Sequence, residues 1–243
     1  GDTIVLRDGT YTCAGNRNIS WAGKTITVSG EHGPENCIVD GGHNGWLFSF
    51  TGGEGPDSVL DGVTMRRGSN NLGAIQCVGS SPTIRNCVLK EQGGDGIFCN
   101  NAAPTITGCT IRGCRDGVVT CAGGISDSEI SHNYQTGLVS VTGDIVRCRI
   151  ISNGDSGLWA ISGTRILDSV IAENRAQRGG GVRILADIEI HRTLIARNDA
   201  TFGGGIHISP GKRLNLYNSI VADNLARDDG AALYVDKLSS TVT

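Results

Sequence analysis

The run Pro82-Thr83-Ile84-Arg85-Asn86-Cys87-Val88-Leu89 recurs downstream as Pro104-Thr105-Ile106-Thr107-Gly108-Cys109-Thr110-Ile111. Extending the comparison in both directions gives eight rows, spaced by about 20 to 25 residues, which is the period of a solenoid repeat. The anchor residues of the rows are Gly62, Cys87, Cys109, Ser128, Cys148, Ser169, Thr193 and Ser219. An apolar residue stands three positions before each anchor, from Val59 to Leu216, and a second column stands two positions after it, from Thr64 to Val221.

The apolar segments are short, alternating and rich in β-branched residues, which favours strands over helices. One row is too short to bury its own apolar face, so rows must stack, about 4.8 Å apart, to share a core. Two earlier coils are indicated by Ile4, Leu6 and Tyr11, and by Ile26, Val28, Ile38, Leu47 and Phe48. We therefore predict an all-β fold, a single-stranded parallel β-helix (solenoid) of about ten coils. A leucine-rich repeat has a similar period, but its Leu-x-x-Leu-x-Leu frame is missing here.

The composition mainly excludes certain classes of protein. With 21 basic and 24 acidic side chains the net charge is −3, so no basic field favours nucleic acid. No apolar run approaches the roughly 20 residues of a membrane span. Nothing marks a second domain, so residues 1–243 are predicted to form one β-helix domain. Its strand-like start suggests a fragment of a longer chain.

The segment from Gly1 to Tyr11 resembles the opening coil of pectate-lyase-like right-handed β-helix proteins. The rows with Asn174 and Gly179–Gly181, and with Asn198 and Gly203–Gly205, resemble the repeats of adhesin-like proteins, including polymorphic membrane proteins. The resemblance implies right-handed winding and a secreted or surface-displayed protein. It says little about activity, because this superfamily contains lyases, hydrolases, epimerases and non-catalytic surface proteins.

Two columns of small polar residues are predicted to support the stack. The consecutive asparagines Asn133, Asn153, Asn174, Asn198 and Asn224 are expected to form a ladder at one corner. Most of the nine cysteines fall in inward columns, where thiols act as small apolar groups. One such column holds Cys87, Cys109 and Cys148, and another holds Cys77 and Cys99 with Thr120, Ser140 and Ala160.

The best candidate binding residues follow the small–apolar pair that opens the last strand of each row, where alternation directs a side chain outward. In the C-terminal rows these residues are Trp159, Arg183, His207 and Tyr234. Aromatic rings can stack on sugars, and Arg183 and His207 could neutralise a uronate carboxylate or move a proton. We expect these four residues to share one exposed face, with Arg183 and His207 as the catalytic pair if the protein is a lyase.

A glycoside hydrolase would instead need two carboxylates across the scissile bond. Asp95 and Asp116 lie in equivalent corner loops, but Asp before Gly is also common turn chemistry. No zinc-like spacing is present and no metal site is predicted, with calcium at the corner aspartates as a weak alternative.

We therefore expect a secreted or surface-displayed, non-catalytic β-helix that binds a polysaccharide or cell-surface glycan, or serves as a spacer that self-associates end to end. The alternative is an enzyme, a polysaccharide lyase or glycoside hydrolase acting on an acidic polysaccharide. Convergent charge in one groove would distinguish the two, because a lyase needs both a base and a group that neutralises the carboxylate.

Overall fold

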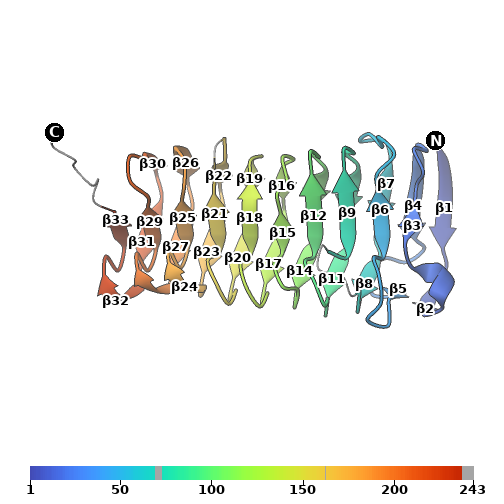
Figure 1. The fold of residues 1–243 in the computed structure, drawn as a ribbon, viewed down its shortest axis with the longest axis horizontal. Helices are drawn as coiled ribbons and strands as arrows, with labels where there is room; N and C mark the ends of the chain where they lie inside the picture. Colours follow the sequence, from blue (N-terminus) through green and yellow to red (C-terminus); the bar gives the residue numbers. More distant parts are fainter. Residues whose placement is uncertain (69–72, 162, 237–243) are drawn as a thin grey trace, which may run out of the picture.

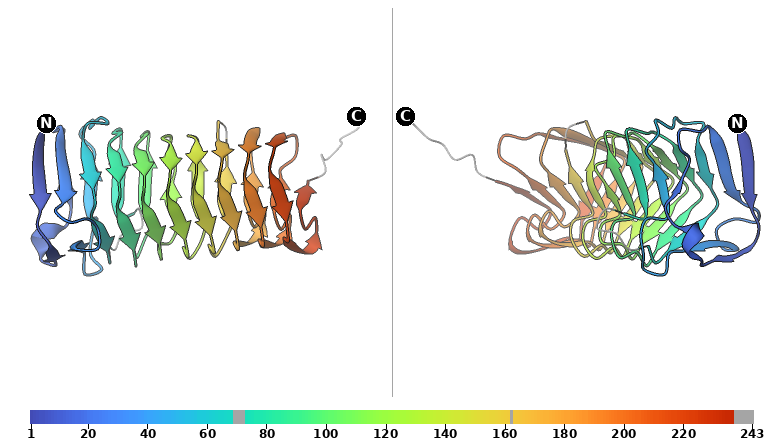
Figure 2. Two further views of the ribbon diagram at one scale, coloured as in Figure 1. Left: turned by 180° about the vertical axis from the view of Figure 1, so that it is seen from behind. Right: turned by 45° about the vertical axis from the view of Figure 1, so that its right-hand side comes forward.

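The chain forms a long stack of coils, described here from a computed structural model for residues 1–68, 73–161 and 163–236. Each coil contributes one strand to each of three parallel ten-stranded sheets, and the first and last described coils lie at opposite ends of the rod (Figures 1 and 2). The prediction of a β-helix with about ten coils is confirmed. Within the described residues, no helix has the length and apolar character needed to cross a membrane.

The three sheets follow one another in every coil and are called sheets A, B and C. Sheet A contains β1 (Asp2–Leu6), β4 (Ile26–Gly30), β7 (Val59–Asp61), β10 (Thr83–Arg85), β13 (Thr105–Thr107), β16 (Ile125–Ser126), β19 (Ile145–Val146), β22 (Arg165–Leu167), β26 (Ile188–His191) and β30 (Leu214–Tyr217). Sheet B contains β2 (Gly9–Tyr11), β5 (Cys37–Asp40), β8 (Thr64–Arg66), β11 (Val88–Lys90), β14 (Thr110–Arg112), β17 (Glu129–Ser131), β20 (Arg149–Ile151), β23 (Val170–Ala172), β27 (Leu194–Ala196) and β31 (Ile220–Ala222).

Sheet C contains β3 (Ile19–Ser20), β6 (Phe48–Phe50), β9 (Ile75–Val78), β12 (Ile97–Asn100), β15 (Val118–Val119), β18 (Leu138–Val141), β21 (Leu158–Ala160), β25 (Val182–Ile184), β29 (Ile206–Ile208) and β33 (Leu233–Val235). Between sheets B and C, the last coils add a three-stranded corner sheet of β24 (Arg175–Arg178), β28 (Asp199–Phe202) and β32 (Leu225–Asp229). One short 3-10 helix, η1 (Ala14–Asn16), lies in the first coil.

The core consists of stacked columns of identical or similar apolar side chains. Ile150 is fully buried, and its strand pairs it with Ile130 on one side and Ile171 on the other. The predicted register of the column formed by Ile130, Ile150 and Ile171 is therefore confirmed.

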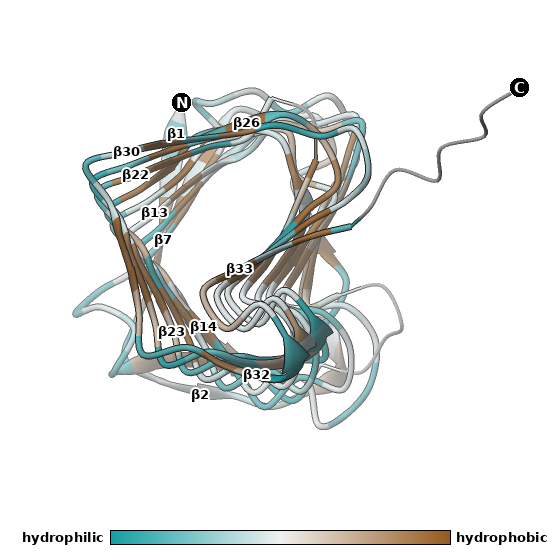
Figure 3. Cartoon of the chain, turned by 90° about the vertical axis from the view of Figure 1, so that its left-hand side faces the viewer, coloured by the Kyte–Doolittle hydropathy of each residue, from teal (hydrophilic) through white to brown (hydrophobic). Residues whose placement is uncertain are grey.

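Viewed along the rod, the three sheets surround a common interior, with β32 at the corner beside β33 (Figure 3).

The corner between sheets A and B contains a residue with a positive φ angle, which precedes the buried anchor. Asp127, Arg147, Asp168 and Arg192 occupy this position in four successive coils, with φ between 47° and 52°. Arg147 forms two hydrogen bonds to Asp127, and Arg192 does the same with Asp168. These pairs are largely exposed, so each is expected to add little to stability beyond fixing the corner.

The predicted register is wrong by one residue in the first row. Leu60, not Val59, pairs with Ile84 and is fully buried, and Met65 takes the inward position that was assigned to Thr64. The cause is Gly62, which has a φ of 64° and forms the corner itself, so that Val63 becomes the buried anchor.

The asparagine ladder is confirmed. Asn174 donates from Nδ2 to the carbonyl oxygen of Ile150 at 3.0 Å and to Oδ1 of Asn198 at 3.0 Å. The Oδ1 atom of Asn174 in turn accepts from the backbone N–H and the Nδ2 of Asn153. The Asn174 amide therefore bonds the coil before it and the coil after it at this corner.

The cysteines are free, and all but Cys13 are buried. In the predicted column of Cys77 and Cys99, Ala160 is buried as expected, but Thr120 is exposed and Cys121 is buried in its place. Thr120 has a φ of 54°, and this left-handed residue shifts the following side chain inward. One coil later, Ser140 and Val141 repeat the arrangement.

Candidate functional site

The predicted strip of outward residues is built by strand alternation in the C-terminal half of sheet C. In β25 the flanking residues Val182 and Ile184 are buried in the core, so Arg183 between them points away from it. The strands β21, β25, β29 and β33 are neighbours (Figure 1). Their register aligns, in order, Trp159, Arg183, His207 and Tyr234. The structure therefore places the four predicted residues in one column.

Arg183 and Trp159 form a cation–π pair at the start of this column. The guanidinium carbon of Arg183 lies 5.1 Å from the centre of the Trp159 ring. Both side chains are half-buried, and neither Nε of Arg183 nor Nε1 of Trp159 has a hydrogen-bond partner within the described residues. Arg183 is thus a positively charged group, held in place by an aromatic ring, with donor capacity left over.

His207 differs from the expectation of an exposed side chain, since only 1 % of its surface is accessible. The Tyr234 ring stacks on it with centroids 5.6 Å apart, and Oδ2 of Asp236 lies 3.3 Å from Nε2. Neither ring nitrogen makes an aligned hydrogen bond within the described residues. Burial lowers the pKa of His207, and Arg178 and Arg183 act in the same direction against Asp236, so the imidazole is neutral at pH 7.

Three further residues belong to this cluster and were missed from the sequence. Arg178 and Phe202 come from the corner sheet, and Asp236 follows β33. The guanidinium carbon of Arg178 lies 5.9 Å from the Phe202 ring centre, while its Nη1 approaches Oδ2 of Asp236 at 3.3 Å. Phe202 packs against Tyr234 with ring centroids 5.3 Å apart. The sequence signal for these residues was the longer spacing between the last rows, because the additional residues in those rows form the corner sheet.

The corner aspartates proposed for a hydrolase are engaged in local structure. Asp95 is buried and accepts two hydrogen bonds from Arg115, at 2.8 and 2.7 Å. Asp116 accepts the backbone N–H of Thr136 at 2.8 Å. Burial raises the pKa of both carboxyls, although Arg115 opposes this at Asp95. These contacts join the corners of neighbouring coils, so the two carboxylates have a structural role, although the bonds are not those of a local turn.

The side chains that could hold a metal ion lie in the first two coils, away from Asp95 and Asp116. Among the described residues, the group of side chains close enough to share an ion is Asp8, Glu31 and His32, all exposed in the first two coils. His32 Nδ1 already lies 3.0 Å from Oδ2 of Asp8. This group is remote from the column in sheet C.

The fold is shared with enzymes that act on polysaccharides. The A-module of the mannuronan C-5 epimerase AlgE6 from Azotobacter vinelandii superimposes with a TM-score of 0.74 at 12 % identity, over 96 % of this chain and 71 % of the epimerase module. The pectate lyase Pel9A superimposes with a TM-score of 0.64 at 17 % identity, over 98 % of this chain and 70 % of the lyase. No curated protein matches the sequence significantly. The family model of right-handed β-helix regions matches residues 1–134 and 137–243, and the chain belongs to that family.

Proposed function

We propose that this protein binds an acidic polysaccharide along the outward face of sheet C, over the column from Trp159 to Tyr234. The observation that carries the proposal is Arg183, whose guanidinium lies on Trp159 and makes no ion pair with a carboxylate of the described residues. The guanidinium group binds a carboxylate with two parallel hydrogen bonds, which is the group that a uronate sugar presents.

The aromatic rings beside Arg183 suit the rest of such a ligand. Trp159 and Tyr234 lie three coils apart, which is roughly 14 Å at the spacing of stacked strands. Rings of this kind stack on the apolar faces of sugar units. The two structural relatives also support the proposal. Their names give mannuronan and pectate as the polymers on which they act, and both are polymers of uronic acids.

A second candidate function is proton abstraction by His207, as in a polysaccharide lyase or epimerase. A neutral imidazole can remove the proton from the carbon that bears the carboxylate, while an arginine stabilises the negative charge that develops. The lowered pKa of His207 and the proximity of Arg183 and Arg178 favour this role. Access to a sugar carbon would require the side chains that cover His207 to move, so binding is the first conclusion and catalysis the second.

The direct test compares oligomannuronate and oligogalacturonate with the same oligosaccharides after reduction of their carboxyl groups. Calorimetric titration of the purified chain should show binding of the acidic forms that weakens with salt. Arg183→Ala should lower that affinity about tenfold or more. Arg112→Ala provides the matched control, because Arg112 is an exposed arginine on sheet B. Equal affinity for acidic and reduced forms would refute the proposal.

Release of unsaturated sugars and a change in uronate configuration, followed on the same oligosaccharides, test the second candidate. Polysaccharides of this kind are found outside cells, so we also propose that the protein works there, secreted or displayed at the cell surface. The non-catalytic binding protein and the enzyme would then share one binding face. They would differ only in whether His207 acts as a base on the bound polymer.

A further inference from the structure

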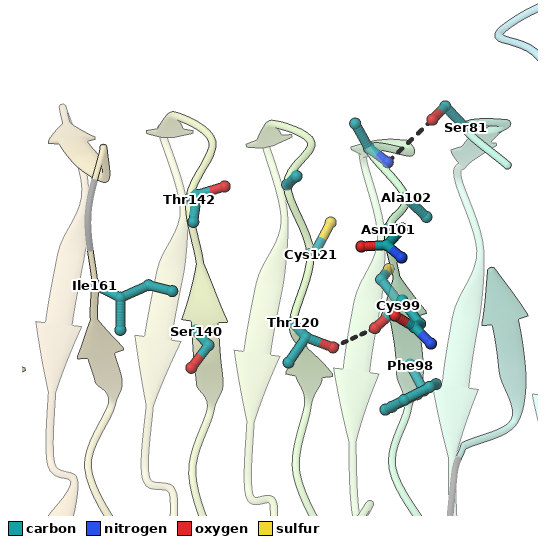
Figure 4. A pocket seen from close by; sticks show the side chains of 13 residues that line it. Ser81, Phe98, Cys99, Asn101, Ala102, Thr120, Cys121, Ser140, Thr142 and Ile161 are labelled. Atoms are coloured by element: carbon teal, nitrogen blue, oxygen red, sulfur yellow. Dashed lines mark hydrogen bonds between the residues drawn. The ribbon is translucent and has the colours of Figure 1, made fainter. Parts of the chain in front are cut away.

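Next to the column of charged and aromatic residues, the same side of the rod is hollowed at the edge where sheet C turns towards sheet A. The hollow has a volume of about 680 Å³. Its walls come from five successive coils and include Ser81, Phe98, Thr120, Thr142 and Ile161 (Figure 4). Neither Arg183 nor His207 lines it.

The lining of the hollow is polar but uncharged. None of the described residues that line it is an acid, a base or a histidine. Within the described part of the chain, no hydrogen bond engages the side-chain amides of Asn100 and Asn101 or the hydroxyl of Thr142, so donors and acceptors remain available there. Phe98 and Ile161 supply apolar surface beside them. A ligand with both hydroxyl groups and apolar faces fits this lining, and a charged ligand finds no counter-charge in it.

The backbone beside the hollow is left-handed in three successive coils and bulged between two strands. Asn101, Thr120 and Ser140 have φ angles of 49°, 54° and 55° in three successive coils. The pairing of β18 with β21 shifts between Val139 and Val141, which marks a bulge. A β-branched residue such as Thr120 rarely adopts a positive φ, and such strain and bulges gather where a fold directs side chains toward a ligand.

The hollow and the charged column are continuous along sheet C. The register of the sheet runs from Phe98 through Val119 and Val139 to Trp159. From Phe98 to Arg183 there are four coil steps, or roughly 19 Å. One extended chain molecule can therefore reach both places.

We propose that the hollow is a binding subsite for an uncharged sugar unit of the same polymer whose uronate unit is held at Arg183. The preferred ligand is then a mixed polysaccharide in which neutral and acidic units alternate or occur in blocks. This inference rests on the proposed function for the class of polymer. The neutral unit is inferred from the uncharged lining of the hollow and from the left-handed, bulged backbone beside it.

The test uses oligosaccharides of one length, prepared from oligomannuronate and oligogalacturonate with none, half or all of the carboxyl groups reduced. Half-reduced oligosaccharides should bind the native chain most tightly. Ala122→Trp fills the hollow from an exposed position on its wall, and should abolish that preference while leaving the affinity for the fully acidic form unchanged. Ala14→Trp, at an exposed position in η1 of the first coil, is the control and should change neither affinity.

Asn101→Gly provides a second variant that is independent of the bulky tryptophan. Glycine adopts the positive φ at this position without strain and removes the whole Asn101 side chain with its amide, so the preference for half-reduced forms should decrease severalfold. Thermal melting of each variant verifies that it is folded.

The outcomes separate the two proposals. If Arg183→Ala weakens binding but Ala122→Trp and Asn101→Gly leave every affinity unchanged, the neutral subsite is refuted and the proposed function stands. If only the two hollow variants weaken binding, the subsite stands and the uronate site at Arg183 is refuted. If the native chain binds the fully acidic form most tightly and the hollow variants bind as it does, the preference for a mixed polymer is overturned. If no form binds, both proposals fail.

Discussion

Asn174 and Asn198 are joined by two hydrogen bonds across neighbouring coils, because Oδ1 of Asn198 accepts both the backbone N–H and the Nδ2 of Asn174, each at 3.0 Å. Both side chains are fully buried. The same relationship links each asparagine from Asn133 to Asn224 with the next. A buried amide thus forms the link between coils at the corner that precedes sheet C.

Asn174→Leu should destabilise the protein strongly. Leucine cannot accept from Asn153 or donate to Ile150, and each buried group left unpaired costs about 1–3 kcal/mol. Urea unfolding measures the change. Asn215→Leu on the exposed side of β30 is the control and should stay within about 0.5 kcal/mol of the native chain. Equal stability of the two variants would mean that the ladder is unimportant for the fold.

Ile150→Ala should cost about 2–5 kcal/mol, because it leaves a cavity between Ile130 and Ile171. Ile151→Ala on the same strand removes a half-buried side chain that points the other way, and should cost clearly less. Denaturant unfolding of both variants tests the assigned register. A larger loss for Ile151→Ala would reverse it.

Thiol titration should show rapid labelling of Cys13 alone in the native protein. The other eight cysteines are buried, and burial raises the pKa of thiols such as Cys148, to about 11, which suppresses the reactive thiolate. In denaturant all nine should react. Cys13→Ser should abolish the rapid phase, and rapid labelling of several thiols in that variant would contradict the inward columns.

Asp40 should make stability dependent on acidic pH. Hydrogen bonds from Arg67, together with Arg66 and the backbone of Gly42, lower the pKa of this buried carboxyl to about 2. Because the folded-state pKa lies below the unfolded value of about 4, the stabilising contribution is complete above pH 4 and is lost as the pH falls toward 2. Its size is about 2 kcal/mol.

Melting curves between pH 2 and 7 test this expectation. Asp40→Asn should lose most of that free energy at pH 7 and show a flatter acid dependence. Asp57→Asn changes an exposed aspartate and should melt like the native chain at every pH. An unaltered acid profile in Asp40→Asn would rule out the ion pair as its source.

His207 gives the catalytic candidate a distinct pH signature. Burial lowers the pKa of His207, so the neutral base should persist below pH 6.5 and any lyase or epimerase activity should decrease only at lower pH. His207→Asn should reduce turnover about 10²–10⁴-fold with binding retained. His132→Asn, at an exposed corner of sheet B, is the control. Turnover that survives in His207→Asn would exclude this base.

Much of the sequence prediction depended on local rules that every coil repeats. Rows such as those of Ile130, Ile150 and Ile171 carry the same spacing, and in-register stacking then brings equal positions together. The first row was misaligned because Gly62, which forms the corner, was taken as the anchor in place of Val63.

The sequence by itself determined the parallel solenoid, the core columns, the asparagine ladder and the alignment of Trp159 with Arg183, because all of these follow from period and alternation. Only the tertiary structure decided that Arg178, Phe202 and Asp236 join Tyr234 and His207 in one cluster, and that His207 is buried. Arg178 and Phe202 lie on a corner sheet that only the last coils contain, and Asp236 follows the last strand, so no repeat places them. The tertiary structure also decided the hollow beside Thr120. A left-handed residue shifts the following side chains to the other face of the strand, and threonine has no local preference that would predict a left-handed conformation.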